Sequence, residues 1–263
     1  MLYLSWLRPG ALSLSDYRIA YCEAGPQVLS SVVVCIHGAG GNRDSWIPLM
    51  RNLARQGVNS LALELPGHGE SDVAQISDIK EYSRIVLEFL NAKKLKSVCL
   101  TGHSMGGAVV LESAMTHSEL LRGVILIGSG AKLRVKDSIL KGVKSDFVKT
   151  VDEIIGYAFS STADPSLVRE GTRSLLRCDA DTLRHDFIAC DRFDVLSELV
   201  SISTPALILC GEDDHLTPPK YSQFMSEKIP NAKLTIVPKS GHMVMLEQPD
   251  MVGDLISQFM NDL

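Results

Sequence analysis

The sequence of 263 residues has no long hydrophobic run, no excess of positive charge and no closely paired cysteines. Its longest wholly apolar stretches, such as residues 32–36, are far shorter than the roughly 18 residues that a membrane-spanning helix needs, so we expect no membrane protein. Lys and Arg number 26 against 31 Asp and Glu, which gives a net charge of −5. Because there is no basic surface to neutralise phosphates, we expect no nucleic acid partner.

The sequence also lacks the short motifs that bind metals, nucleotides or phosphate. It contains no HExxH, no EF-hand loop, no P-loop and no GxGxxG after a strand, so we expect no metal and no organic cofactor. The six cysteines form no CxxC pair, and several stand in apolar, strand-like runs; they are Cys22, Cys35, Cys99, Cys178, Cys190 and Cys210. We interpret them as small buried hydrophobic side chains rather than as disulfides or metal ligands.

The first ten residues, MLYLSWLRPG, place apolar side chains before Arg8. This order is the reverse of a signal peptide, in which a basic segment precedes the apolar one. We therefore expect a cytoplasmic protein.

Short β-branched runs alternate along the chain with longer stretches of helical periodicity. This pattern is typical of βα units around a mostly parallel sheet, and the length fits one large domain or one domain with an insertion. The predicted strands are 17–22, 31–36, 58–63, 96–101, 122–127, 204–210 and 232–237. The predicted helices are 45–55, 77–92, 104–116, 219–228 and 249–262.

Residues 131–201 break this alternation because they contain no convincing strand. Amphipathic helical spacing recurs there instead, and Asp164-Pro165 provides a helix N-cap followed by proline at the first helical position. We predict a helical cap at 131–201, inserted into a core formed by residues 1–130 and 202–263. Such a cap can cover a substrate as a lid, or it can simply shield the edge of the sheet.

The strongest functional signal is the segment 102–107, Gly-His-Ser-Met-Gly-Gly, between a predicted strand and a predicted helix. It is a G-x-S-x-G motif in the strand–turn–helix setting that presents a nucleophilic serine. The sharp turn forces Ser104 into a strained backbone conformation, and the flanking glycines avoid a collision across it. We predict that Ser104 is the nucleophile. His103 points away from it on so sharp a turn, and we interpret His103 as a packing residue.

A serine nucleophile needs a neutral imidazole to take its proton and a carboxylate to fix the tautomer of that imidazole. His242 follows the last predicted strand on a glycine-containing loop, at the sheet edge where a base can meet Ser104. Three acids compete at the end of the preceding strand: Glu212, Asp213 and Asp214. The order Ser104, Asp214, His242 matches the Ser…Asp…His order of one hydrolase architecture, and Asp213 is the alternative acid.

Together these segments resemble the α/β-hydrolase superfamily, in particular its capped branch of carboxylesterases, carbon–carbon bond hydrolases and cofactor-free haloperoxidases. The resemblance covers nearly the whole chain except the cap. It rests on four blocks: residues 36–41 with Trp46, residues 65–72, residues 102–107, and the paired segments 211–218 and 241–249. It implies an α/β-hydrolase fold, a mostly parallel twisted sheet flanked by helices with a helical cap insertion. Within the family's G-x-x-D-x-x-x-P pattern the acid falls on Asp214.

The resemblance also assigns roles around the nucleophile. In relatives the residue after His-Gly and the residue after the nucleophile donate backbone N–H groups to the oxyanion, and these positions are Ala39 and Met105. His37 and His68 stand where relatives use histidine to pack and hydrogen-bond loops. We therefore expect both of these histidines to be structural.

Three positions separate the reactions that this fold supports. Epoxide hydrolases and haloalkane dehalogenases attack with Asp, whereas this chain has Ser104. Carbon–carbon hydrolases usually place an aromatic residue after the catalytic His, and some biosynthetic lyases carry an Arg after the Gly-Gly; here these residues are Met243 and Ala108. The resemblance therefore favours a carboxylesterase with an acyl-enzyme on Ser104. The alternatives are a ring-cleavage-product carbon–carbon hydrolase and a small-molecule sensor with a hydrolase fold.

We expect the substrate pocket to lie between the turn at Ser104 and the cap. Its predicted lining is Met243, Phe147, Ile155 and Phe159, which would form an apolar acyl site. The expected partner is a small-molecule ester, with neither nucleic acid nor membrane. The chain is expected to be a monomer or a homodimer.

Overall fold

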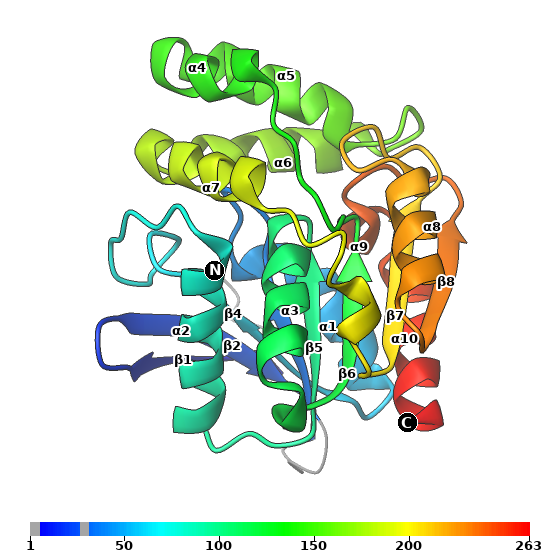
Figure 1. Cartoon of the computed structure of the whole chain (residues 1–263). Helices are drawn as coiled ribbons and strands as arrows, with labels where there is room; N and C mark the ends of the chain where they lie inside the picture. Colours follow the sequence, from blue (N-terminus) through cyan, green and yellow to red (C-terminus); the bar gives the residue numbers. More distant parts are fainter. Residues whose placement is uncertain (1–5, 27–31) are drawn as a thin grey trace.

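The core of the protein is a twisted sheet with helices on both faces (Figure 1). The computed structural model describes residues 6–26 and 32–263, within which the sheet has eight strands in the order β1-β2-β4-β3-β5-β6-β7-β8. β1 and β2 run antiparallel to their neighbours, and the remaining strand pairs are parallel. The strands are β1 (Arg8–Ser13), β2 (Arg18–Ala24), β3 (Val32–Ile36), β4 (Asn59–Leu63), β5 (Val98–His103), β6 (Leu121–Ile127), β7 (Ala206–Gly211) and β8 (Ala232–Val237).

Side chains of the central strands alternate between two hydrophobic cores, because successive residues of a strand point to opposite faces. Val34 and Leu100 pack on the face covered by α2 (Ile79–Ala92), α3 (Met105–Thr116) and α8 (Pro219–Lys228). Cys35 and Cys99 pack on the other face, under α1 (Ile47–Arg55), α9 (Val244–Glu247) and α10 (Pro249–Asp262). Short 3-10 helices lie at Arg43–Trp46, Ser118–Leu120 and Leu199–Ser201.

The predicted fold class is confirmed, and each predicted strand and core helix is present. The elements at 219–228, 232–237 and 249–262 have the predicted bounds, and the others are shifted by one or two residues at one or both ends. Residue 31 of the predicted strand 31–36 and residues 1–5 of the N-terminal segment lie outside the described residues. Strand β1 was not predicted, because Pro9 and Gly10 interrupt its sequence. Proline is tolerated there because β1 lies at the edge of the sheet, where a backbone N–H can go unpaired.

Four helices lie between β6 and β7 and stack above the carboxyl end of the sheet (Figure 1). They are α4 (Asp137–Ser145), α5 (Phe147–Ala158), α6 (Pro165–Leu176) and α7 (Ala180–Arg192). Asp164 caps α6 as the sequence predicts, since its carboxylate accepts the N–H of Ser166. An isolated bridge between Lys132 and Asp194 joins the two chain segments that lead into and out of these helices.

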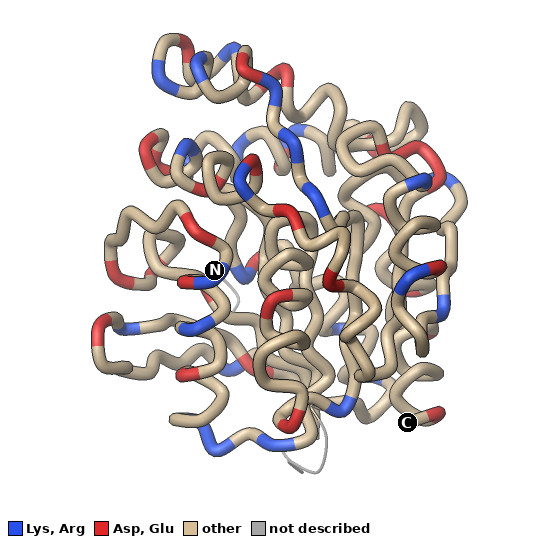
Figure 2. The backbone as a smooth tube through the Cα atoms, viewed as in Figure 1, with Lys and Arg blue, Asp and Glu red and all other residues tan. Residues whose placement is uncertain are grey.

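The six cysteines are free thiols, and all are buried except Cys178, which is partly exposed. Positively and negatively charged residues are interspersed along the backbone (Figure 2). In the described part of the chain, no helix is both long enough and apolar enough to cross a bilayer.

Candidate active site

Ser104 is the single residue between β5 and α3, and its backbone conformation is rare for residues other than glycine. Its φ is 52° and its ψ is −115°. A Cβ on Gly102 would collide with the carbonyl of Gly106, and a Cβ on Gly106 would collide with the carbonyl of Ile36. Only glycine fits on either side of the serine, so the turn is tight enough to present the hydroxyl at the N-terminus of α3.

His242 and Asp214 meet at the carboxyl ends of β8 and β7. The Nδ1–H of His242 donates to Oδ2 of Asp214 at 2.9 Å, and both residues are buried. The Oδ1 atom of Asp214 accepts the N–H groups of Leu216 at 2.9 Å and Thr217 at 2.8 Å. The Thr217 hydroxyl donates to Oδ2 at 2.8 Å. Four hydrogen bonds thus hold this carboxylate beside the imidazole.

The environment of Asp214 favours its charged form. Burial alone would raise the pKa of this carboxyl, but attraction to His242 and the hydrogen bonds from His242 and Thr217 outweigh it and hold the pKa below its usual value. The charged carboxylate keeps a proton on Nδ1 of His242 and leaves Nε2 free to accept one. Among the described residues, the Asp213 side chain has no hydrogen-bond partner. Of the competing acids, Asp214 is therefore the one that contacts His242.

His103 supports the loop of residues 238–243, which carries His242 and which we call the histidine loop. Its Nε2–H donates to the backbone carbonyl of His242 at 3.0 Å, and the two rings lie 4.6 Å apart. Burial, followed by the neighbouring His242, lowers the pKa of His103 to about 3, so the ring stays neutral. His103 therefore packs as the sequence predicts and also fixes the backbone that carries His242.

Glu247 ties the same loop to the α4–α7 insertion. Its Oε1 accepts the N–H of Gly241 at 2.8 Å, and its Oε2 accepts the N–H of Ser160 at 2.9 Å. Gly241 precedes His242, and Ser160 follows α5. One carboxylate thus connects the histidine loop with the helices above it.

The loop after β3 packs directly against the serine. A Cβ on Gly38 would lie 3.2 Å from the Cβ of Ser104. Within the described ranges, the backbone N–H groups of Ala39 and Met105 have no hydrogen-bond acceptor. Both predicted main-chain donors are therefore free to bind an oxygen next to the serine.

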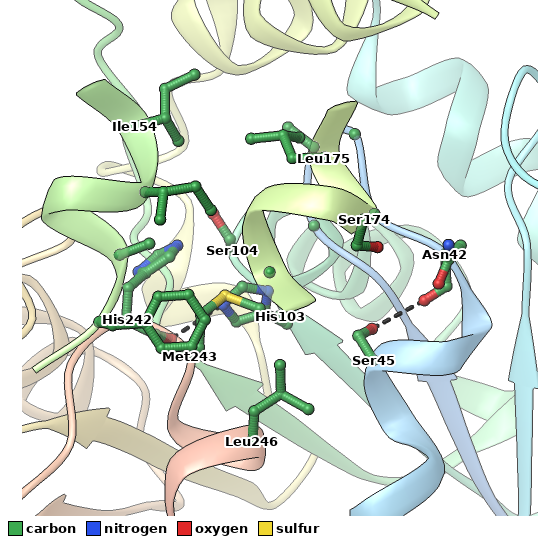
Figure 3. A pocket seen from close by; sticks show the side chains of 18 of the residues that line it. Asn42, Ser45, His103, Ser104, Ile154, Ser174, Leu175, His242, Met243 and Leu246 are labelled. Carbon is green, nitrogen blue, oxygen red and sulfur yellow. Dashed lines mark hydrogen bonds between the residues drawn. The ribbon is translucent and has the colours of Figure 1, made fainter. Parts of the chain in front are cut away.

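A cavity of about 310 Å³ opens over Ser104 and His242, between the sheet and the α4–α7 insertion. Its apolar wall includes Ile154, Ile155, Phe159, Leu175, Met243 and Leu246. Figure 3 shows Ile154, His242 and Met243 on one side of this cavity, and the polar residues Asn42, Ser45 and Ser174 on the other. This cavity is thus lined by both apolar and polar side chains.

Three of the predicted pocket residues, Met243, Ile155 and Phe159, line this cavity. Phe147 does not: it lies in the first turn of α5, two turns before Ile155, and packs into the cluster formed by the insertion itself. Leu175, on α6, lines the cavity but was not predicted. The only sequence signal for it was the amphipathic spacing of α6, which does not say what the apolar side faces.

Thr217, which hydrogen-bonds Asp214, was also not predicted as a site residue, although it lies within the segment 211–218. The available signal was a threonine three residues after the acid. No group of three or more His, Cys, Asp or Glu side chains in the described part of the chain is arranged to hold a metal.

Comparison with known proteins gives the family. A sequence model of the alpha/beta hydrolase family matches residues 33–255. The chain belongs to this family. It is 27% identical to a putative 2-succinyl-6-hydroxy-2,4-cyclohexadiene-1-carboxylate synthase of Bacillus subtilis, over 96% of this chain and 98% of the relative. It is also 27% identical to a pimeloyl-[acyl-carrier protein] methyl ester esterase of Neisseria meningitidis, over 86% of this chain and 92% of that esterase.

Solved structures agree with this assignment. The structure of a thermophilic esterase superimposes with a TM-score of 0.87 and 30% identity, over 97% of this chain and 98% of the esterase. An enol-lactonase from Burkholderia xenovorans has a TM-score of 0.88 at 19% identity, over 96% and 100% of the two chains, and shows the shared fold alone. The family, together with the two esterases among these relatives, identifies this chain as a hydrolase.

Proposed function

We propose that this α/β hydrolase is a serine carboxylesterase, which cleaves small to medium uncharged esters through an acyl-enzyme on Ser104. The observation that carries the proposal is the 2.9 Å bond from His242 to Asp214, beside a cavity that His242 shares with Ser104. These three residues would form the catalytic triad. The esterases among its relatives support ester chemistry.

In the first half of the reaction, Oγ of Ser104 attacks the ester carbonyl carbon while Nε2 of His242 takes the hydroxyl proton. The carbonyl oxygen becomes an oxyanion and binds the N–H groups of Ala39 and Met105. Each such donor typically stabilises the transition state by about 3–4 kcal/mol. The charge of Asp214 stabilises the imidazolium that forms.

The tetrahedral intermediate then collapses to the acyl-enzyme, and His242 gives its proton to the departing alkoxide, which leaves as an alcohol and completes the first half. Hydrolysis of the acyl-enzyme is the second half. A water molecule then gives a proton to His242 and attacks the acyl carbon. The second intermediate collapses to a carboxylic acid, and Ser104 regains its proton. The two halves together consume one ester and one water, and they need no redox partner.

The cavity supports small to medium apolar acyl groups. Its volume of about 310 Å³ is at the lower end of the range of about 300–1,000 Å³ for small-molecule sites. Each methylene that enters the apolar wall contributes about 0.8 kcal/mol, or about fourfold in kcat/KM. Ile155 and Phe159 come from the 131–201 segment, so we infer that this segment acts as a lid over the substrate.

Two features argue against anionic substrates. Arg177 is the cation lining the cavity within the described residues, and it is paired with Glu170 at 3.5 Å. Ala108, fully buried behind the turn, stands where the resemblance expects a carboxylate-binding arginine in biosynthetic lyases. The reaction named for the Bacillus subtilis relative is therefore disfavoured for this chain.

The proposal is tested with p-nitrophenyl esters from acetate to laurate. We expect saturable turnover with an optimum below the longest chains, and its loss in Ser104→Ala. Ser226→Ala, a change at a partly exposed serine on α8, is the matched control and should leave turnover unchanged. Full activity of Ser104→Ala would refute the proposal. So would the absence of turnover on every ester by folded protein whose Ser104 reacts with a fluorophosphonate.

A further inference from the structure

Asp186 is a fully buried carboxylate on α7 that takes no part in the chemistry above. Its Oδ2 accepts the backbone N–H of Gly40 and a hydrogen bond from Nε2 of His68, each at 2.8 Å. Its Oδ1 accepts the hydroxyl of Tyr82 at 2.7 Å. The three partners belong to the loop after β3, the loop after β4 and helix α2. A residue of the α4–α7 insertion is thus bonded to three separate parts of the core.

The carboxylate and His68 form a buried ion pair. Nδ1 of His68 faces the carbonyl of Pro66 at 3.1 Å, and Nε2 faces Asp186, so the doubly protonated, positively charged form of the ring satisfies both acceptors. Burial by itself would lower the pKa of His68, but the charge of Asp186 and the hydrogen bonds outweigh it and raise this pKa. The side chains of both residues have no exposed surface.

The bonds to this loop fix the two peptide groups on either side of Ala39. The carbonyl of Gly38 accepts the Nδ1–H of His37 at 2.8 Å and the N–H of Gly41 at 3.0 Å. In a trans peptide the N–H points opposite to the carbonyl, so these bonds turn the N–H of Ala39 away from His37. The next peptide is held because Asp186 accepts the N–H of Gly40, a residue at φ +65°.

We propose that Asp186 is a positioning residue that makes the oxyanion hole depend on docking of the cap. With α7 docked, its carboxylate holds the peptide after Ala39, and the Ala39 N–H keeps the direction set by the bonds to the Gly38 carbonyl. When α7 lifts, this hold is lost together with the pair to His68. The inference rests on the proposed function, because it assumes that Ala39 donates to an oxyanion during acyl transfer.

The test compares three variants of the full-length protein. Asp186→Ala removes the acceptor, and kcat should fall about 100-fold, the usual effect of losing one oxyanion donor, with KM changed less than threefold. Asp186→Asn keeps an oxygen toward Gly40 and His68 and turns its amide toward Tyr82. A neutral acceptor is weaker than a charged one, so kcat should fall only about 3- to 10-fold. Tyr82→Phe leaves the Gly40 bond intact and is the matched control, with kcat within threefold of the wild type.

Two readouts separate positioning from mere stability. Active sites are titrated with a fluorophosphonate, so that kcat is expressed per reactive Ser104 and an unfolded fraction does not count. The affinity for a trifluoromethyl ketone, which forms an oxyanion on the serine, should fall by the same factor as kcat in each Asp186 variant. A residue that only stabilises the fold would lower the melting temperature and change neither readout.

The proposal is overturned if Asp186→Ala keeps kcat per titrated site within threefold of the wild type, or if the ketone affinity does not follow kcat. Should Asp186→Ala fail to fold, the parallel fall of kcat and ketone affinity in Asp186→Asn carries the same test. These outcomes are distinct from failure of the esterase function, which would leave the wild type itself without ester turnover.

Discussion

Replacing Asp214 by asparagine changes few atoms but should reverse the hydrogen bond between this residue and His242. Two backbone N–H groups, from Leu216 and Thr217, point at Oδ1, so the amide oxygen must take that position. The amide nitrogen then takes the place of Oδ2 and donates to Nδ1 of His242. The imidazole is left with its proton on Nε2, which can no longer accept the proton of Ser104.

The expected loss is large because the whole active population carries the wrong tautomer. An Asp-to-Asn change of this kind lowers kcat by about 10⁴ in a serine hydrolase, which corresponds to about 5.4 kcal/mol of transition-state stabilisation. KM should change little, since Asp214 does not line the cavity. The melting temperature should fall only modestly, because three of the four hydrogen bonds to this side chain can be remade.

The assay is steady-state hydrolysis of the best p-nitrophenyl ester by the wild type, Asp214→Asn and the matched control Asp213→Asn. The control removes the neighbouring carboxylate, which has no hydrogen-bond partner among the described residues, and should retain kcat within twofold. Retention of more than a tenth of the wild-type kcat by Asp214→Asn would refute the reasoning. An equal loss of kcat in both variants would mean that Asp214 is wrongly assigned as the acid.

His103→Phe removes the donor to the His242 carbonyl. In saturation kinetics kcat should fall about tenfold at constant KM, which corresponds to a loss of about 1.4 kcal/mol of transition-state stabilisation. An unchanged kcat would contradict this role of His103. Glu247→Ala should speed tryptic cleavage of the α4–α7 insertion relative to the wild type, because the carboxylate bonds this insertion to the histidine loop. An unaltered cleavage rate would count against that link. The raised pKa of His68 means that its pair with Asp186 stabilises the fold fully below the ordinary value of about 6.5. This stabilisation is lost as the pH rises through the folded-state value, so the melting temperature of the wild type should fall more steeply at alkaline pH than that of Asp186→Asn; parallel curves would contradict it.

The sequence was most informative where short motifs sit at the ends of parallel strands. Because β5, β7 and β8 run in the same direction, the residues that follow them lie at one edge of the sheet. That rule predicted the meeting of Asp214 and His242 and their nearness to the turn at Ser104. Topology alone therefore brought distant motifs together.

Residues whose role depends on distant partners were beyond local patterns. Asp186 lies 118 residues from His68 and 104 from Tyr82, and nothing in its neighbourhood indicates that it is buried. Phe147 has the correct spacing for an apolar helix face, but spacing does not say whether that face meets the cavity or other helices. Strand β1 was missed because Pro9 interrupts its sequence, although an edge strand tolerates a proline.

The bridge between Lys132 and Asp194 bears on how the inserted segment of this fold can be exchanged. Since the insertion leaves and re-enters the core at adjacent points, a helical segment of another length can be grafted there without rebuilding the sheet. The graft is constrained at one position: without a carboxylate in place of Asp186, it would leave Nε2 of His68 and the N–H of Gly40 buried without an acceptor. Exchange of the α4–α7 insertion for another helical segment should therefore succeed most often when the incoming segment carries an acid at that site.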